Sequence, residues 1–170
     1  MHMRFCSLLL VIMLGSVALH AQQDPLIGTW KLNPAKTKYN PGAPPSSAIN
    51  TFEASGANGV RHISERVNAD GSKIRQEFTV QFDGKDYPDR DTSTPAPGAQ
   101  PAATVADTRD AVSVDRIDPY TYRVSYKLKG KPVQMNYWSV SKDGRTLSVF
   151  STGLTATNGV YQRMLVYDKQ

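Results

Sequence analysis

Two segments of the sequence alternate hydrophobic and polar residues with a period of two. Residues 73–82 place Lys73 and Arg75 on one face and hydrophobic residues on the other, and residues 121–128 follow the same pattern. Successive side chains of a strand point to opposite faces, so the alternation predicts antiparallel strands with one buried face. The buried faces are predicted to carry Ile74, Gln76, Phe78, Val80 and Phe82 in the first segment and Tyr122, Val124, Tyr126 and Leu128 in the second.

Turn dipeptides separate further hydrophobic runs. Asn58-Gly59, Asp70-Gly71 and Asp143-Gly144 are typical of hairpin turns, because these residue types tolerate a positive φ. No window shows the periodicity of an amphipathic helix. The additional predicted strands are residues 27–33, 48–54, 59–67, 112–117, 132–141, 145–152 and 160–168. Short strands with regular turns predict an all-β sandwich or barrel, and we expect a single domain over residues 22–170.

Two proline-rich segments interrupt the strand pattern. Residues 34–47 and 88–110 are both rich in proline, which cannot donate to a strand ladder. We therefore expect residues 34–47 to form a loop or an open cover segment. Residues 88–110 are expected to form a long exposed loop rich in Pro and Ala.

The first residues have the three parts of a secretory signal. Arg4 precedes the apolar run 8–14, and Ala18 and Ala21 offer small residues for a signal peptidase. The run is too short for a membrane-spanning helix, which needs about 20 apolar residues. The sequence predicts a signal peptide over residues 1–21, cleaved after Ala21 or alternatively after Ala18, and hence a secreted or periplasmic protein without a transmembrane segment in its mature form.

Several chemistries are disfavoured by the few cysteines and histidines. The one cysteine, Cys6, lies in the signal segment, so the mature chain has no disulfide and no thiolate metal site. Outside the signal segment the one histidine is His62. Ser64 would lie about 7 Å away on the same strand face, too far for direct proton transfer. We expect His62 at the surface or rim of a strand, and we predict no catalytic triad, no metal site and no cofactor.

Acidic residues leave two alternatives open. Asp83, Asp86, Asp89 and Asp91 cluster near one predicted loop and could bind calcium weakly, although a solvated charged turn explains them better. Glu53, Glu65 and Glu77 lie on three different predicted strands, so a carboxylate pair of a hydrolase is the least favoured functional alternative. The prediction is that the protein is not an enzyme.

The charge of the chain argues against nucleic acid as a partner. The 20 Lys and Arg residues exceed the 15 Asp and Glu residues only modestly. The basic residues are scattered, with no long basic run and no interleaved aromatic residues, so they fit a solvated surface.

A resemblance extends over most of residues 27–170. Gly28-Thr29-Trp30 resembles the Gly-x-Trp motif that opens lipocalins, and the runs 28–38, 83–88, 140–147 and 166–170 resemble those of small exported bacterial lipocalin-like proteins of the calycin type. The resemblance departs at residues 89–109. It implies an antiparallel up-and-down β-barrel of about eight to ten strands with a central cavity. It also implies structural roles for Gly28 and for Trp30, which would close the base of the barrel against Arg163 of the last strand.

Barrel closure also has a physical reason, because it hides the strand edges through which sheets aggregate. An outer-membrane barrel is disfavoured, since Arg75, Glu77 and Gln81 would lie on its lipid-facing surface.

The predicted barrel interior supplies a candidate ligand site. Its members are Ile74, Gln76, Phe78, Val80, Tyr122, Val124, Tyr126, Met135, Tyr137 and Met164, with Val133 and Val166 on the same predicted faces. An apolar lining with a few polar groups is typical of small-molecule pockets, although a filled core would use the same residues. We therefore expect a binding protein for a small apolar or amphipathic ligand. The alternative is an envelope interaction or structural protein that acts through its proline-rich loops.

Overall fold

The computed structural model describes residues 23–40, 42–91, 109–154 and 159–170. Within these residues the chain forms twelve β-strands and one 3-10 turn, η1 (Pro34–Lys36). The strands are β1 (Gly28–Leu32), β2 (Lys38–Asn40), β3 (Ser47–Ala54), β4 (Gly59–Val67), β5 (Lys73–Gln81), β6 (Tyr87–Pro88), β7 (Arg90–Asp91), β8 (Ala111–Asp118), β9 (Thr121–Leu128), β10 (Lys131–Val140), β11 (Thr146–Leu154) and β12 (Val160–Lys169). The predicted all-β class is confirmed. No helix in the described part of the chain is long and apolar enough to cross a membrane.

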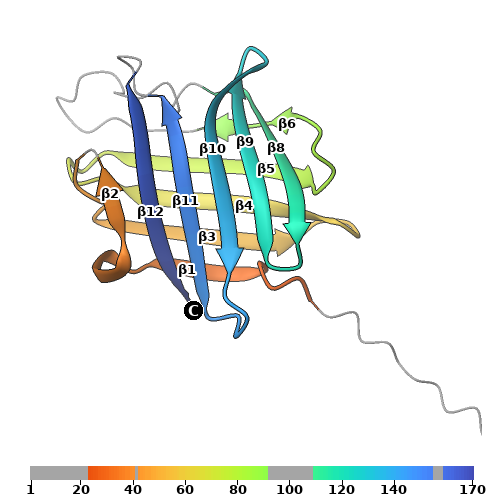
Figure 1. Cartoon of the computed structure of the whole chain (residues 1–170), viewed down its shortest axis with the longest axis horizontal. Coiled ribbons are helices and arrows are strands. Elements are labelled where there is room, and N and C mark those ends of the chain that lie inside the picture. Colours follow the sequence, from red (N-terminus) through yellow and green to blue (C-terminus); the bar gives the residue numbers. More distant parts are fainter. Residues whose placement is uncertain (1–22, 41, 92–108, 155–158) are drawn as a thin grey trace, which may run out of the picture.

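All strands belong to one antiparallel sheet that curls into a nearly closed barrel. The strand order is β6-β8-β9-β10-β11-β12-β1-β3-β4-β5-β7, and β2 pairs separately with β12. Strands β8 to β12 run across β3, β4 and β5, so the barrel has two crossing walls (Figure 1). β12 pairs with β11 and with β1, and thereby joins the walls at one side. The remaining seam lies between β5 and β8, where Asp83 and Asp115 form an isolated bridge.

The nine long strands agree with the sequence prediction, and the three short ones do not. Each of the nine lies within two residues of a predicted range. The strand β2 lies inside the segment 34–47, which was predicted to be a loop, and pairs through Tyr39 opposite Arg163. Its three residues contain no proline, so their amides can join a ladder. Of the other predicted loop, residues 92–108 lie outside the described residues, as does the predicted signal peptide.

Trp30 is buried in the core, but it does not pack against the residue that the resemblance implied. Trp30 is fully buried, and its indole N–H donates to the Leu26 carbonyl at 2.9 Å. The cation over its ring is Lys169, whose Nζ lies 4.9 Å from the ring centroid. Lys169 is directly opposite Trp30 in the β1–β12 register, whereas Arg163 pairs with β2 further along β12. The predicted contact between Trp30 and Arg163 is therefore wrong.

Two positions near strand ends require glycine, Gly28 for its positive φ and Gly59 for close backbone packing. Gly28 has a φ of +136°, and a Cβ on it would lie 2.8 Å from Cε of Lys169. Gly59 was predicted to be a turn residue, but it is the first residue of β4, and the positive φ of this hairpin belongs to Gly56. A Cβ on Gly59 would lie 2.3 Å from the Val80 carbonyl oxygen. Gly59 is therefore needed for strand approach rather than for the turn.

Candidate functional site

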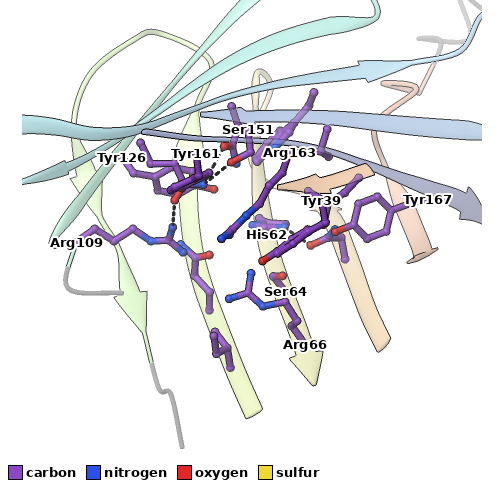
Figure 2. Close-up of a pocket in the computed structure, with 18 of the residues that line it drawn as sticks. Tyr39, His62, Ser64, Arg66, Arg109, Tyr126, Ser151, Tyr161, Arg163 and Tyr167 are labelled. Atoms are coloured by element: carbon purple, nitrogen blue, oxygen red, sulfur yellow. Dashed lines mark hydrogen bonds between the residues drawn. The ribbon is translucent and has the colours of Figure 1, made fainter. Parts of the chain in front are cut away.

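A cavity of about 100 Å³ lies between the two walls of the barrel, and polar side chains form most of its lining. Figure 2 shows these side chains converging from both walls. The polar lining residues are Tyr39, Asn50, His62, Ser64, Arg66, Gln76, Arg109, Tyr126, Gln134, Asn136, Ser151, Tyr161, Arg163 and Tyr167. The apolar ones are Phe52, Ile74, Trp138, Val149 and Leu165. The cavity is therefore far more polar than the predicted apolar pocket.

The predicted interior residues fall into three groups. Ile74, Gln76 and Tyr126 line the cavity. Phe78, Val80, Tyr122 and Val124 are buried in the apolar core and do not line the cavity. Met135, Tyr137 and Met164 point away from it, because the inward positions of β10 and β12 are their sequence neighbours.

The error in β10 and β12 is one of strand phase. In β10 the pairing with β9 shifts register between Pro132 and Gln134, so Val133 is buried while Met135 and Tyr137 face outward. Asn136 and Trp138 occupy the inward positions instead. A one-residue shift moves every following side chain to the other face. The sequence of β12 offers hydrophobic residues on both faces, which hides its phase.

A buried ion pair lies beside the cavity, and its cation, Arg109, belongs to the lining. Asp89 has a fully buried side chain, and its Oδ2 lies 2.6 Å from Nε of Arg109, which is 9% exposed. The Gln76 side-chain amide donates to both Asp89 oxygens at 2.9 and 2.8 Å. Asp89 was predicted to belong to a solvated charged turn, and this prediction is wrong. A carboxylate so deeply buried needs the counter-charge and hydrogen bonds that Arg109 and Gln76 supply.

Arg109 is held in place from two further directions. Its guanidinium lies 4.1 Å from the centroid of the Tyr126 ring. Its Nη1 donates to Oε1 of Gln134 at 3.1 Å, and the Gln134 amide in turn donates to Asn136 at 2.9 Å and to Ser151 at 3.2 Å. The charge of Arg109 is therefore balanced by Asp89, and its guanidinium is held in place by the protein itself.

Arg163 and Arg66, unlike Arg109, have no carboxylate partner among the described residues. The Arg163 guanidinium is sandwiched between the rings of Tyr39 and Tyr161, at 4.1 and 4.2 Å from their centroids. Arg66 reaches the same cavity from β4 (Figure 2). Neither arginine forms an ion pair or hydrogen bond within the described residues, and the buried Nε of each lacks an acceptor. Sequence periodicity gave no signal for them, because a charged residue on a strand is normally assigned to the wet face.

His62 lies inside the barrel rather than at its surface or rim, as the sequence had suggested. Its ring is 4% exposed and stacks on Phe52 at 4.5 Å between centroids. Nε2 lies 3.1 Å from Oδ1 of Asn50, whereas the buried Nδ1 has no partner. Burial and the nearby Arg109 charge lower the pKa of His62 to about 3. The imidazole is therefore neutral at neutral pH.

Tyrosines add neutral hydroxyl groups to the lining. Burial raises the pKa values of Tyr126, Tyr161 and Tyr167 above that of a free phenol. No carboxylate lines the cavity within the described part of the chain, and the charge of Arg109 is balanced by Asp89. The positive charges of Arg66 and Arg163 thus dominate the electrostatics of the cavity.

The carboxylates considered for other chemistries lie elsewhere. Glu53 and Glu77 are on the outer face of the barrel, where Arg61 donates to them at 2.8 and 2.7 Å. Glu65 is on the same face, 3.5 Å from Arg75. Asp83 and Asp86 pair with Lys85 and Lys127. No group of metal-binding residues is found among the residues described, and the three glutamates do not meet inside the barrel.

Comparison with known proteins gives only distant likenesses. No family model matches the chain, and no curated protein does. A redesigned β-barrel is 12% identical over 86% of this chain and 92% of that one, with a TM-score of 0.47. Zebrafish ileal bile acid-binding protein, solved in complex with cholic acid, is 14% identical over 86% of this chain and 98% of that one, also with a TM-score of 0.47. Neither likeness assigns a family or a ligand to this chain.

Proposed function

We propose that this chain is a binding protein that holds a small polar ligand inside its barrel. The observation that carries the proposal is the cavity itself, into which unpaired polar groups point from both walls. Buried polar groups normally have hydrogen-bond partners, so a cavity lined with unpartnered donors is a site whose occupant supplies them. The sequence predicted an apolar or amphipathic ligand. The polar lining instead favours a ligand that has several polar groups.

The size of the cavity supports a small ligand. Pockets for drug-sized molecules enclose roughly 300–1,000 Å³. The cavity of about 100 Å³ holds several water molecules or one compact organic molecule. Its apolar walls, Phe52 and Trp138 among them, would contact the carbon skeleton of such a molecule.

The groups available for chemistry favour binding over turnover. His62 is neutral and, with a pKa of about 3, a weak base. Ser64 lines the cavity on the same strand as His62 without a hydrogen bond to it, and no carboxylate of the described residues orients the imidazole. We keep the hydrolase alternative only as an outcome of the test below.

Export is part of the same proposal. The support is the basic and apolar pattern of residues 1–21, and the sequence places the cleavage after Ala21. N-terminal sequencing of the protein recovered from the medium or periplasm of an expressing bacterium is expected to begin at Gln22. Retention of residues 1–21 on the recovered protein would contradict this part of the proposal.

Trp138 supplies the readout for binding, because it lines the cavity, whereas Trp30 is fully buried and does not line it. We expect small polar molecules to change the Trp138 fluorescence and to raise the unfolding temperature. Ser151→Phe, which fills the cavity, should abolish both effects. Ser148→Phe on the outer face of the same strand is the matched control and should retain them. A panel that binds equally to both variants would contradict a site inside the barrel, and consumption of a panel member would favour an enzyme.

A further inference from the structure

Two positive charges in the cavity have no counter-charge among the residues that the structure describes. Among the described residues, Arg61, Arg75, Arg109, Arg116 and Arg123 all pair with carboxylates. Arg66 and Arg163 pair with none, although both are partly buried and line the cavity. The Nε of each is buried without an acceptor, and such a group is costly, so these two guanidinium groups are poised for an anion that the described residues do not provide.

Arg163 is fixed before any ligand arrives. The rings of Tyr39 and Tyr161 cover its two faces at about 4 Å, which leaves the N–H edges of the guanidinium as its remaining contact surface. A guanidinium presents its donors as a planar fork that matches the two oxygens of a carboxylate. Stacking thus selects the orientation in which Arg163 can hold a planar oxyanion.

The rest of the lining favours an organic anion over an inorganic one. Phe52, Trp138 and Leu165 form apolar parts of the same cavity, and a phosphate or sulfate ion would leave them without contacts. The amides of Asn50 and Asn136 and the hydroxyl of Ser151 offer neutral hydrogen-bonding groups. An ammonium group would be repelled by the two arginines, which disfavours amines and amino acids.

From these contacts we propose that the barrel binds a small organic carboxylate, with Arg66 and Arg163 as its counter-charges. The proposal rests on the proposed binding function and specifies its ligand class. Two uncompensated cations match two carboxylates best, so a compact dicarboxylate is the preferred form. Binding involves no covalent step, and its main gain is the pairing of two charges that have no counter-charge among the described residues.

The test compares ligands that differ only in charge. Succinate, succinamate and succinamide have nearly the same shape and carry two, one and no carboxylates. We expect the dissociation constant, measured by calorimetry and by Trp138 fluorescence, to rise by about tenfold or more at each step. Binding of succinate should weaken as the salt concentration rises. Equal affinity for the three compounds would overturn the carboxylate proposal while leaving a binding barrel intact.

Variants of the two arginines locate the charges. Arg66→Gln and Arg163→Gln should each weaken succinate binding by about tenfold to a hundredfold. Arg163→Lys, which keeps the charge but loses the fork, should also weaken it. Arg145→Gln is the matched control, because Arg145 is exposed in the turn between β10 and β11. Undiminished binding to Arg66→Gln and Arg163→Gln would overturn the proposal.

Two further measurements distinguish a failure of the carboxylate proposal from a failure of the binding function. Without ligand, Arg66→Gln should unfold at an unchanged or higher temperature, because it removes an unpaired charge; a marked fall would indicate a structural role and contradict the proposal. Inorganic phosphate binding more tightly than any carboxylate would also contradict it. If no compound in the panel binds and the Ser151→Phe variant behaves as the parent protein does, the binding function itself fails together with its ligand class.

Discussion

A buried histidine makes the stability of this barrel sensitive to acid. The pKa of His62 is about 3 in the folded protein and about 6.5 when the chain is unfolded. The unfolded chain therefore binds more protons at every pH between these values, so the contribution of neutral His62 to stability is lost as the pH falls from 6.5 towards 3. The loss is about 1.4 kcal/mol for each pH unit in this window.

His62→Gln should remove this part of the acid sensitivity, because an amide does not titrate and can still donate to Asn50. Denaturant unfolding of both proteins at pH 7, 5 and 4 measures the effect. The carboxylates whose pKa values are lowered in the folded state, Glu77 and Asp168 among them, also destabilise the protein in acid, but they are present in both proteins. Parallel curves of unfolding free energy against pH would contradict the assignment to His62.

The Asp89–Arg109 pair illustrates how burial increases the stability that is lost when an ion pair is broken. Asp89→Asn would leave Arg109 without its counter-charge at 9% exposure, and we expect a loss of about 3–5 kcal/mol in unfolding free energy. The exposed pair of Lys36 and Asp168 is the control, with exposures of 56% and 43%, and Lys36→Met should cost less than about 1 kcal/mol. Similar losses in the two variants, measured by urea unfolding, would be the contrary result.

Two hairpin glycines are needed for different reasons: Gly59 for close packing against a neighbouring strand, and Gly71 for a positive φ. Gly59→Ala would press a Cβ against the backbone carbonyl of Val80, and we expect a loss of about 3 kcal/mol. Gly71→Ala meets open space and costs only the strain of a φ of +82°, about 1 kcal/mol. Urea unfolding of both variants measures these losses in unfolding free energy. A larger loss for Gly71→Ala than for Gly59→Ala would contradict the structure.

The strands themselves could be predicted from the sequence because hydrophobic alternation and turn dipeptides are local signals. The long strands β4 and β9 have the bounds that their patterns indicate. What could not be predicted is which face of β10 and β12 points inward, since a bulge at Pro132 and hydrophobic residues on both faces of β12 leave the local pattern ambiguous. Those two faces supply Gln134, Asn136 and Trp138 to the cavity, so these lining residues were missed although the barrel was not.

Arg109 and Asp89 show a second kind of limit. Both lie at the ends of the segment 88–110, whose composition indicates an exposed loop. Their burial follows from a contact between residues twenty positions apart in the sequence, and no periodic pattern marks such a pair. The place of Arg109 in the cavity lining and its pairing with Asp89 therefore required the three-dimensional arrangement.

For the molecule as a whole, the length of strand pairing differs around the barrel. The strands from β8 to β12 pair along nearly their full lengths, whereas the seam between β5 and β8 is bridged by the two-residue strands β6 and β7 and by the Asp83–Asp115 bridge. Short ladders open more readily, so amides of residues 83–90 should exchange with deuterium faster than those of β11. Mass spectrometry after proteolysis measures this, and equal protection of the two regions would contradict a weak seam.

The position of β12 in the strand order affects how the barrel can be completed during synthesis. Residues 160–169 are translated after every other strand, yet they lie between β11 and β1 and also pair with β2. In the N-terminal wall, residues 28–81, the edge strand β1 therefore cannot pair with β12 until the other wall has been synthesised. A ribosome-bound chain that lacks β12 leaves the edges of β11 and β1 open, so the interior can be enclosed only after residues 160–169 have left the ribosome.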